Sequence, residues 1–462
     1  MAKVKRRDLL KAGAALAAAG TLGKGFAQEF YASPPTLLPR SRAPRVVVVG
    51  GGWGGTTVAR KVKQQNPGVE VVLVEQKPIF MSCPMSNLFL AGVKPLEWLV
   101  FDYTNVVKDG VIFVQEKVLE INRDRRLVRT TGGYLAYDFL VLAPGIDYMY
   151  EAIPGYEEAK HFLPVGFKPF EHIALRRMLD RFDETGGELV MYIPPPPYRC
   201  PPGPYERACQ VAHYFSQAKP KSKVLILDEN EDVTSKGPLF KKAWADRYKG
   251  IIEYRPRHKV TDVDAATNTF KFDFNDDVKA SVVNYIPPMR AGDIAVKTGL
   301  ATANQRWCEV DFLTFESVAV KNIHVLGDSI QIAPAMPKSA HMANSHAKVA
   351  AAAVVALVGQ SPSEVLTVLA FELEAEHGKV EKLFVDRNDR TGFSLVLSFA
   401  GPANRFANAL RHFVVKFCLL GLAVLVEHPR RAEMRERIQR ILRQPGVNPA
   451  GSDIKLRLRQ RF

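Results

Sequence analysis

One cysteine of this sequence has the surroundings of a reactive thiol. Cys200 lies in a proline-rich run and is followed by a predicted helix from Pro204 to about Phe215. Proline is favoured at the first position of a helix, and the positive end of a helix stabilises a nearby thiolate. A thiolate at Cys200 could take up sulfur as a persulfide or form a disulfide, and then release two electrons. The alternative is a structural cysteine in a rigid proline loop.

The cysteines as a set exclude a scaffold held together by disulfides. There are five in 462 residues, an odd and sparse number, and they are Cys83, Cys200, Cys209, Cys308 and Cys418. No pair has the short spacing of a zinc site or of a c-type haem motif, and the histidines show no metal-ligand spacing with acids or thiols. The sequence therefore predicts separate thiols and no metal site.

A glycine-rich turn marks a predicted dinucleotide site. The apolar run Val46–Val49 is followed by Gly50, Gly52 and Gly55 in a G-x-G-x-x-G arrangement, then by a helical stretch and a second apolar strand that ends in Glu75. The first glycine permits a tight turn, the second lets backbone amides approach a pyrophosphate, and the third lets helix and strand pack. Glu75 can then accept the hydroxyls of the adenosine ribose.

Two later segments favour FAD as the dinucleotide. One buried strand ends in a tight turn that contains Ala143 and Gly145, and another ends in Gly327 and Asp328. They are spaced as in flavoproteins with two dinucleotide-binding folds. In those proteins the aspartate hydrogen-bonds the ribityl or pyrophosphate end of FAD.

A helix should follow the Gly-Asp pair. Residues 337–357 are rich in alanine and valine, and the segment begins with Pro337, Lys338 and Ser339. The positive end of such a helix would point toward the flavin pyrimidine. Lys338 and Ser339 are therefore included among the predicted FAD contacts.

The middle of the chain should form a second nucleotide-binding fold, but it lacks the glycine turn. Strands are expected at Glu188–Ile193 and Lys223–Asp228, yet the first of them leads into the proline-rich run Pro194–Pro204. Proline has no N–H to donate and a locked φ, so this run cannot cradle a phosphate. We therefore expect that NADH is not the electron donor.

These patterns predict an α/β protein with two Rossmann-like three-layer domains and a divergent carboxy-terminal segment. The expected FAD-binding domain is discontinuous and comprises residues 44–155 and 285–360. Residues 156–284 form the second domain, without an NAD fingerprint, and residues 361–462 form the divergent region.

Positive charge is concentrated at the two ends of the chain. Of the net charge of +15, residues 1–24 carry +5 and residues 405–462 carry +9, which leaves +1 for the 380 residues between them. Nucleic acid is therefore not an expected partner of the main body.

Residues 1–27 have the features of a twin-arginine export signal. Arg6 and Arg7 precede a short alanine-rich run, and Gly25, Phe26 and Ala27 resemble a cleavage site. We expect cleavage near Ala27 and a periplasmic protein that is loaded with its cofactor before export. A basic amino-terminal helix is the alternative.

The motifs together resemble the flavoprotein subunit of flavocytochrome c sulfide dehydrogenase and, more distantly, sulfide:quinone oxidoreductase. Both are FAD-dependent members of the pyridine nucleotide-disulfide oxidoreductase superfamily. The resemblance covers roughly residues 44–360. The segments that carry it are Gly50–Gly55, Met81–Asn87, Arg199–Arg207, Trp307–Asp311, Thr314–Ser317 and Gly327–Ser345.

The resemblance implies roles for two cysteines. In the family, the cysteine that matches Cys83 is joined to the flavin 8α-methyl group as a thioether, and the one that matches Cys200 is half of a redox-active disulfide. For Cys83, a turn cysteine beside Pro84 is the alternative. The family oxidises sulfide and passes single electrons to a c-type cytochrome. Because this chain has no haem motif, that acceptor must be another subunit or protein.

The chain departs from the family toward its carboxy terminus. The second redox cysteine should lie near residues 370–378, but Phe371–Gly378 contains no cysteine. Cys308 aligns with a different motif, and no resemblance extends beyond about Val365. Three functions stay open: a sulfide dehydrogenase subunit, a flavin-binding or remnant subunit without turnover, and a sulfide:quinone oxidoreductase at a membrane surface.

The tail at residues 406–442 has an apolar stretch and then a basic one. Residues Phe413–Val426 are apolar apart from Lys416, and they are too few to span a hydrocarbon core of ~30 Å. This segment could lie in a membrane interface with the following arginines on anionic headgroups. The alternatives are a buried helix followed by a solvated basic one, and a shifted reading frame.

Overall fold

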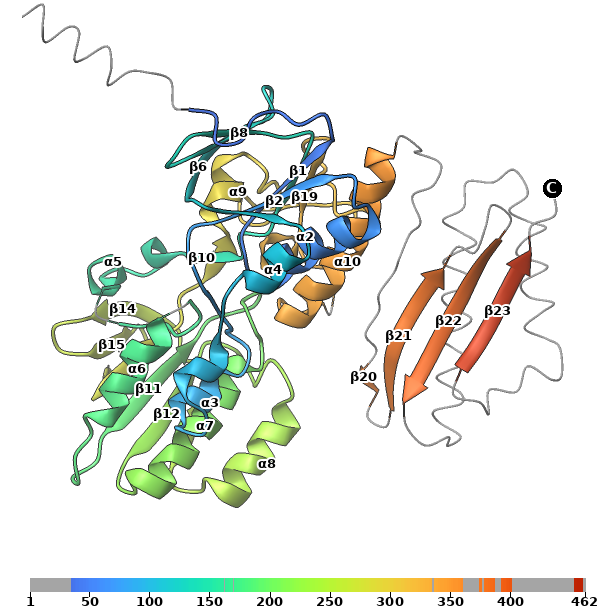
Figure 1. Ribbon diagram of the computed structural model, residues 1–462. Coiled ribbons are helices and arrows are strands. Elements are labelled where there is room, and N and C mark those ends of the chain that lie inside the picture. The colour runs from blue at the N-terminus through green and yellow to red at the C-terminus, as the bar shows by residue number, and fades with distance from the viewer. Residues whose placement is uncertain are drawn as a thin grey trace, which may run out of the picture.

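The computed structural model describes residues 35–161, 163–168, 170–334 and 336–359, together with the backbone of strands at 374–375, 378–386, 392–400 and 453–459 (Figure 1). The predicted export signal, Cys418 and the basic tail at 406–442 lie outside the described residues. Within the described part of the chain, no helix is long and apolar enough to cross a membrane.

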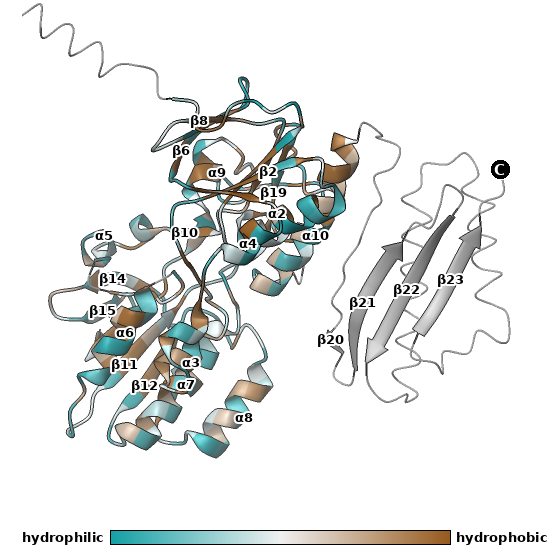
Figure 2. Ribbon diagram, viewed as in Figure 1, coloured by the Kyte–Doolittle hydropathy of each residue, from teal (hydrophilic) through white to brown (hydrophobic). Residues whose placement is uncertain are grey.

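The first sheet has parallel strands in the order β19-β9-β1-β2-β5. Their bounds are β1 Arg45–Val49, β2 Glu70–Glu75, β5 Ile112–Gln115, β9 Phe139–Leu142 and β19 Ile323–Val325. Branched apolar residues fill the central strands, which are buried along their length. A parallel sheet requires this composition because both of its faces are covered. Figure 2 shows the apolar strands.

Two helices complete the first lobe, which is the part of the chain built on this sheet. Helix α2, Trp53–Gln65, follows β1 and packs on β1 and β2. Helix α10, Ala340–Val358, comes almost 300 residues later and packs on α2. The predicted order of strand, glycine turn, helix and strand is confirmed here. The helix expected at 337–357 begins at Ala340, just after its cap Ser339.

The second lobe is built on four parallel strands in the order β13-β12-β11-β17. Their bounds are β11 Glu188–Ile193, β12 Lys223–Asp228, β13 Ile252–Arg255 and β17 Val282–Tyr285. Helix α7, Gly203–Ala218, packs on β11, β12 and β13, and helix α6, Glu171–Asp180, packs on β17. The two strands predicted in this segment are confirmed, and α7 begins one residue earlier than expected.

A short antiparallel link joins the lobes. Strand β10, Ile146–Tyr148, carries the chain out of the first lobe and pairs with β18, Met289–Ala291, which brings it back. Figure 1 shows β10 running between the two lobes. Both crossings lie just beyond the end of β9, so residues of the second lobe reach the carboxyl edge of the first sheet.

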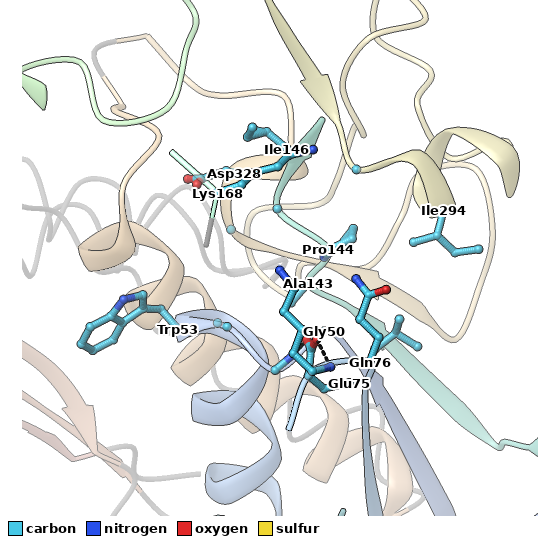
Figure 3. Close-up of a pocket in the computed structure, with 18 of the residues that line it drawn as sticks. Gly50, Trp53, Glu75, Gln76, Ala143, Pro144, Ile146, Lys168, Ile294 and Asp328 are labelled. Atoms are coloured by element: carbon cyan, nitrogen blue, oxygen red, sulfur yellow. Dashed lines mark hydrogen bonds between the residues drawn. The ribbon is translucent and has the colours of Figure 1, made fainter. Parts of the chain in front are cut away.

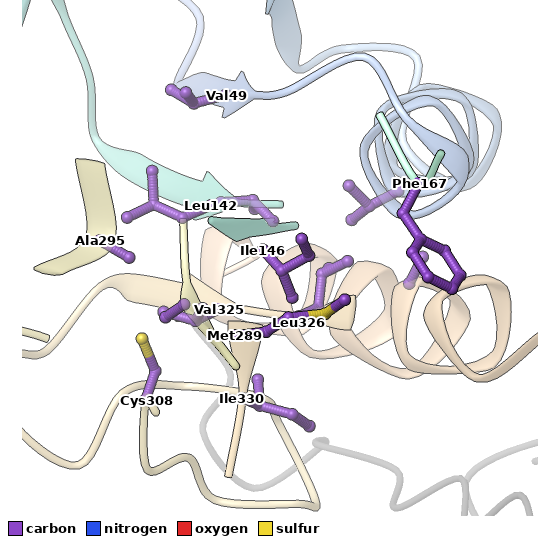
Figure 4. Close-up of a cluster of buried hydrophobic side chains, with 14 of the residues drawn as sticks. Val49, Leu142, Ile146, Phe167, Met289, Ala295, Cys308, Val325, Leu326 and Ile330 are labelled. Atoms are coloured by element: carbon purple, nitrogen blue, oxygen red, sulfur yellow. The ribbon is translucent and has the colours of Figure 1, made fainter. Parts of the chain in front are cut away.

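The lobes share a continuous hydrophobic core. Figure 4 shows Val49 and Leu142 of the first sheet near Ile146 and Met289 of the link. Cys308 is fully buried in the same cluster, so it fills the core as an apolar residue does.

The other elements connect or flank these sheets. The three-stranded sheets β6-β7-β8 and β14-β15-β16 are antiparallel, as is the sheet of β20, β21, β22 and β23. The bounds of the remaining elements are β3 Phe80–Met81, α3 Ser86–Leu90, η1 Leu96–Leu99, β4 Val100–Phe101, α4 Thr104–Lys108, β6 Val118–Asn122, β7 Leu127–Thr130, β8 Tyr134–Ala136, η2 Tyr150–Ala152, α5 Tyr156–Ala159, α8 Gly237–Arg247, β14 Val260–Asp264, β15 Thr269–Phe272, β16 Val278–Lys279, α9 Asp293–Lys297, η3 Gly327–Ser329, β20 Glu374–Ala375, β21 Gly378–Asp386, β22 Gly392–Ala400 and β23 Asp453–Arg459.

The predicted α/β class with two parallel, Rossmann-like sheets is confirmed. The predicted domain bounds stay a prediction.

Candidate functional site

A cavity of about 490 Å³ opens at the carboxyl ends of β1, β2 and β9 (Figure 3). Ligands of open α/β folds bind at this edge, and roughly 300 to 1,000 Å³ is the usual size of a small-molecule site. The first lobe supplies the turns after the three strands and the start of α10. The second lobe supplies Phe167, Lys168 and Arg199.

The glycine turn forms one wall of this cavity. Gly50 has a φ of +102°, and a Cβ there would lie 2.5 Å from the carbonyl oxygen of Ala143. A Cβ at Gly55 would lie 1.7 Å from the carbonyl oxygen of Gly50, whereas one at Gly52 would meet nothing within 4 Å. Gly50 and Gly55 therefore allow the turn to close, and Gly52 leaves room for a ligand. Such a turn before α2 fits a pyrophosphate.

Glu75 lies at the end of β2, beside the glycine turn. Its Oε2 accepts a hydrogen bond from the Gly51 N–H at 2.7 Å, and its Oε1 accepts one from the Lys77 N–H at 3.0 Å. The Tyr103 hydroxyl donates to the Gly51 carbonyl oxygen at 3.1 Å on the same wall. These bonds orient the carboxylate at the cavity, where its predicted role is to accept ribose hydroxyls.

Asp328 has an unused hydrogen-bond acceptor in the cavity wall. Its side chain is only 7% exposed, and Oδ2 lies 3.2 Å from Arg199 Nε. Oδ1 is buried without a partner. A buried carboxylate oxygen without a donor is costly, so a hydroxyl donor from a ligand would stabilise this side chain. Together with the glycine turn, this residue fits the predicted FAD.

The turn after β9 also lines the cavity. Ala143 and Gly145 are part of the wall, and Gly145 has a φ of +73° with no atom within 4 Å of the place where a Cβ would lie. Gly327 faces them from the turn that precedes Asp328. The structure therefore brings these three predicted residues together with Gly50, at one edge of the first sheet.

Lys338 and Ser339 were predicted to contact FAD, but in the structure their side chains bind other parts of the protein. The Lys338 Nζ donates to the carbonyl oxygens of Asp328 and Ile330 at 2.8 and 2.7 Å and lies 3.5 Å from the Trp307 ring centroid. Burial lowers the pKa of this amine to about 7. The Ser339 Oγ caps α10 by accepting a hydrogen bond from the Met342 N–H. Neither side chain lines the cavity, so both serve the predicted site by positioning its parts.

Cys83 lines the cavity in the turn between β3 and α3. Burial raises the pKa of its thiol, and the positive charges of Arg199 and Arg207 oppose that rise. Its predicted attachment to the flavin stays a prediction.

Cys200 is held beside the cavity in a strained backbone conformation. Its φ is +56°, its N–H donates to the Lys338 carbonyl oxygen at 2.7 Å, and its carbonyl oxygen accepts from the Gly203 N–H at 2.7 Å. Such a conformation at a residue other than glycine is more common at functional sites. Cys83 is near enough that its ionisation raises the pKa of Cys200.

The expectation that the end of α7 favours the Cys200 thiolate is wrong for the thiol as it lies here. Burial, together with the charges of Cys83, Glu206 and Asp328, raises the pKa of Cys200 to about 12. Arg199 acts in the opposite direction. Sequence reasoning missed this arginine, although it directly precedes Cys200 in the proline-rich run.

The corresponding position in the second lobe is closed. Asp228 ends β12 as Glu75 ends β2, but it is fully buried. It accepts hydrogen bonds from the hydroxyls of Tyr205 and Tyr254 at 2.7 and 3.1 Å and from the side chain of Asn230 at 2.7 Å. Its carboxylate oxygens are therefore occupied by protein groups, and the run Pro194–Pro204 fills the place of a glycine turn.

Two family models match the chain. Residues 173–287 match the central region of the sulfide dehydrogenase (flavocytochrome c) flavoprotein chain, and residues 44–178 match the pyridine nucleotide-disulphide oxidoreductases. The second match covers the glycine turn, and the first covers Cys200.

Individual relatives agree with these matches. The sulfide dehydrogenase (flavocytochrome c) flavoprotein chain of Chlorobaculum thiosulfatiphilum is 51% identical over 43 residues, which are 9% of this chain and 90% of that sequence. The mitochondrial sulfide:quinone oxidoreductase of Mus musculus is 26% identical over 315 residues, 65% of this chain and 68% of that protein. For the enzyme of the same name from Dictyostelium discoideum, 22% identity extends over 62% of this chain and 65% of that protein, just under two thirds.

The fold has solved counterparts. The crystal structure of the sulfide:quinone oxidoreductase from Aquifex aeolicus superposes with a TM-score of 0.61 over 81% of this chain and 90% of that one, at 17% sequence identity. At this identity the likeness concerns the fold.

Proposed function

Because this chain belongs to the family of the flavocytochrome c sulfide dehydrogenase flavoprotein chain, we propose that it is a periplasmic FAD-dependent enzyme that oxidises sulfide and delivers the electrons to a c-type cytochrome. The observation that carries the proposal is the contrast between the two lobes. The first offers a glycine turn and an unpartnered Asp328 oxygen, whereas the second has prolines and an aspartate occupied by tyrosines. A single dinucleotide site among the described residues, with a thiol beside it, favours a sulfur compound over NADH as the electron donor.

The residues that would hold FAD are already on the cavity wall. The turn from Gly50 to Gly55 would face the pyrophosphate, Glu75 the adenosine ribose, and Asp328 a hydroxyl of the ribityl chain. When bound, FAD accepts an electron pair from a sulfur donor and returns it in single-electron steps.

Cys200 would hold the sulfur during oxidation. Hydrosulfide and the Cys200 thiolate form one S–S bond and lose two electrons and one proton, which leaves a persulfide anion on Cys200. Bound FAD would accept the electron pair, and the proton would go to solvent. A second hydrosulfide then attacks the outer sulfur, which leaves as disulfide anion HSS⁻ and restores the thiolate. In the family, the resemblance implies a second redox cysteine, which this chain lacks near residues 370–378. Release by hydrosulfide takes the place of that cysteine, and an external thiol can perform the release as well.

The choice of electron donor is the direct test. We expect sulfide to bleach the flavin absorbance in anaerobic solution, and NADH at the same concentration to leave it unchanged, because the second lobe has no phosphate cradle. Stopped-flow absorbance of the full chain measures both. Rapid bleaching by NADH would contradict the interpretation of Pro194–Pro204 and the proposed electron source.

Attachment of the flavin through Cys83 is a second prediction. Cys83→Ala should release all its flavin on acid precipitation, whereas the wild-type protein, expressed with its own export route, should precipitate yellow. Cys209→Ala is the matched control, because Cys209 lies on α7 outside the cavity wall and its sulfur accepts from Trp244 Nε1 at 3.2 Å. Colourless wild-type precipitate, or a yellow Cys83→Ala precipitate, would show that no such bond exists.

Reduction of a quinone is the second candidate, because the mouse relative and the solved Aquifex protein are sulfide:quinone oxidoreductases. Supplying sulfide-reduced protein with a c-type cytochrome or with a soluble quinone separates the two. Faster reoxidation by the cytochrome supports the proposal, and faster reoxidation by the quinone supports the alternative.

A further inference from the structure

Arg199 is placed between the cavity and two thiols. Its Nε lies 3.2 Å from Asp328 Oδ2, and its Nη1 donates to the Phe167 carbonyl oxygen at 3.0 Å. The side chain is 24% exposed and lines the cavity, and the residue directly precedes Cys200. Its positive charge acts on both Cys83 and Cys200.

A buried lysine fixes these groups relative to one another. The backbone of Arg199 pairs with that of Lys338, and the Cys200 N–H donates to the Lys338 carbonyl oxygen at 2.7 Å. The Lys338 Nζ, in a side chain only 2% exposed, holds the Asp328 carbonyl oxygen at 2.8 Å. The arginine, the thiol and the carboxylate therefore belong to one rigid frame.

The acidic groups that face Cys200 among the described residues oppose its ionisation, whereas two arginines favour it. Cys83 comes from the turn before α3, Glu206 from α7 and Asp328 from η3, and each carries or acquires negative charge. Arg199, which directly precedes the thiol, and the buried Arg207 of α7 supply the opposing positive charge. An opposite charge within ~4–6 Å typically shifts the pKa of an acid downward by about 1 to 3 units.

We propose that Arg199 is the positioning residue that stabilises the Cys200 thiolate to which sulfide sulfur becomes bound, and that Asp328 controls how much of its charge reaches that thiolate. Asp328 is part of the cavity wall, with one oxygen on Arg199 and the other buried without a partner. When a ligand hydroxyl donates a hydrogen bond to Asp328, it neutralises part of the negative charge of that carboxylate. More of the Arg199 guanidinium charge then stabilises the Cys200 thiolate. Occupation of the cavity and activation of Cys200 are thereby coupled. This inference rests on the proposed function and names a residue that supports it.

The test is the pH profile of Cys200 alkylation in the full chain with its flavin bound. Iodoacetamide is the probe, and mass spectrometry of the Cys200 peptide gives the rate without any use of sulfide. Arg199→Gln should move the midpoint of the profile upward by about one pH unit or more, which is an approximately tenfold lower rate below the midpoint. Arg199→Lys keeps a positive charge and should restore most of the rate.

Two further variants separate an electrostatic role from a structural one. Asp328→Asn removes the competing charge and should move the midpoint downward, opposite to Arg199→Gln. Arg290→Gln is the matched control: Arg290 pairs with Glu151 and Asp293 and does not itself line the cavity, so the same loss of charge should leave the midpoint unchanged.

The inference is overturned if Arg199→Gln keeps the wild-type midpoint, if Arg199→Lys behaves like Arg199→Gln, or if Asp328→Asn shifts the midpoint upward. If Arg199→Gln does not fold, the Lys variant and the direction of the Asp328→Asn shift decide. A protein with the expected profiles that never oxidises sulfide would contradict the proposed function and leave the role of Arg199 standing.

Discussion

Gly55→Ala is expected to abolish flavin binding and to lower the free energy of unfolding by about 3 kcal/mol or more, the upper part of the range for overpacked sites. Its Cβ would lie 1.7 Å from the Gly50 carbonyl oxygen and 3.0 Å from the Gly50 carbonyl carbon. Backbone lies on both sides of this contact, so α2 must move away from the end of β1. The glycine turn that is predicted to hold the pyrophosphate opens with that movement. Urea unfolding and the flavin content of the purified protein measure the two effects.

Gly52→Ala is the matched control for this prediction. A Cβ there would meet no atom within 4 Å, and the φ of −77° suits alanine. The free energy of unfolding should therefore stay close to the wild-type value, while the added methyl group occupies space at the cavity and weakens flavin binding. Equal destabilisation by both variants, or a yellow and stable Gly55→Ala protein, would contradict the assigned roles of the two glycines.

Cys200→Ser is expected to slow sulfide-dependent reduction of the flavin by roughly 100-fold or more, the scale on which loss of an essential nucleophile acts. Serine has the shape of cysteine but forms no persulfide, and its hydroxyl does not ionise near neutral pH. The flavin should stay bound, because its predicted contacts lie on the first lobe. Anaerobic stopped-flow absorbance with sulfide measures the rate.

Cys209→Ser makes the same exchange nine residues further on in α7 and should keep the wild-type rate. A Cys200→Ser protein that is still reduced rapidly would show that the flavin takes electrons without this thiol. If the wild-type protein also fails to oxidise sulfide, even with thiols and a c-type cytochrome supplied, a flavin-binding subunit without turnover becomes the better explanation.

The sequence alone was sufficient wherever the signal is local. The turn from Gly50 to Gly55 spans six residues and is recognisable from its glycine spacing alone. The close approach of Gly55 to Gly50 lies within that turn, whereas Gly50 also approaches the distant Ala143. The strands of both sheets were recognisable because their apolar residues are continuous. The expectation that Pro194–Pro204 cannot cradle a phosphate also rests on a local signal, since the chemistry of a proline run does not depend on distant residues, and it stays a prediction.

The environment of the thiol depended on the tertiary structure. The sequence places Cys200 before a helix, and from that fact a favoured thiolate was expected. Folding surrounds the thiol with Cys83 and Asp328 from distant segments and buries it, and both effects raise the pKa. Arg199, which opposes these effects, was visible as a neighbour in sequence, but its ion pair with Asp328 was not.

The same distinction applies to Lys338 and Ser339. Both were correctly placed near the start of α10, but the sequence did not say which way their side chains act. The structure uses Lys338 to hold the Asp328 turn and Ser339 to cap the helix. Backbone geometry follows from neighbouring residues, whereas burial and charge depend on side chains that come together only when the two lobes fold against each other. For that reason the sequence determined the cofactor class and the fold, and the tertiary structure decided which groups control the thiol.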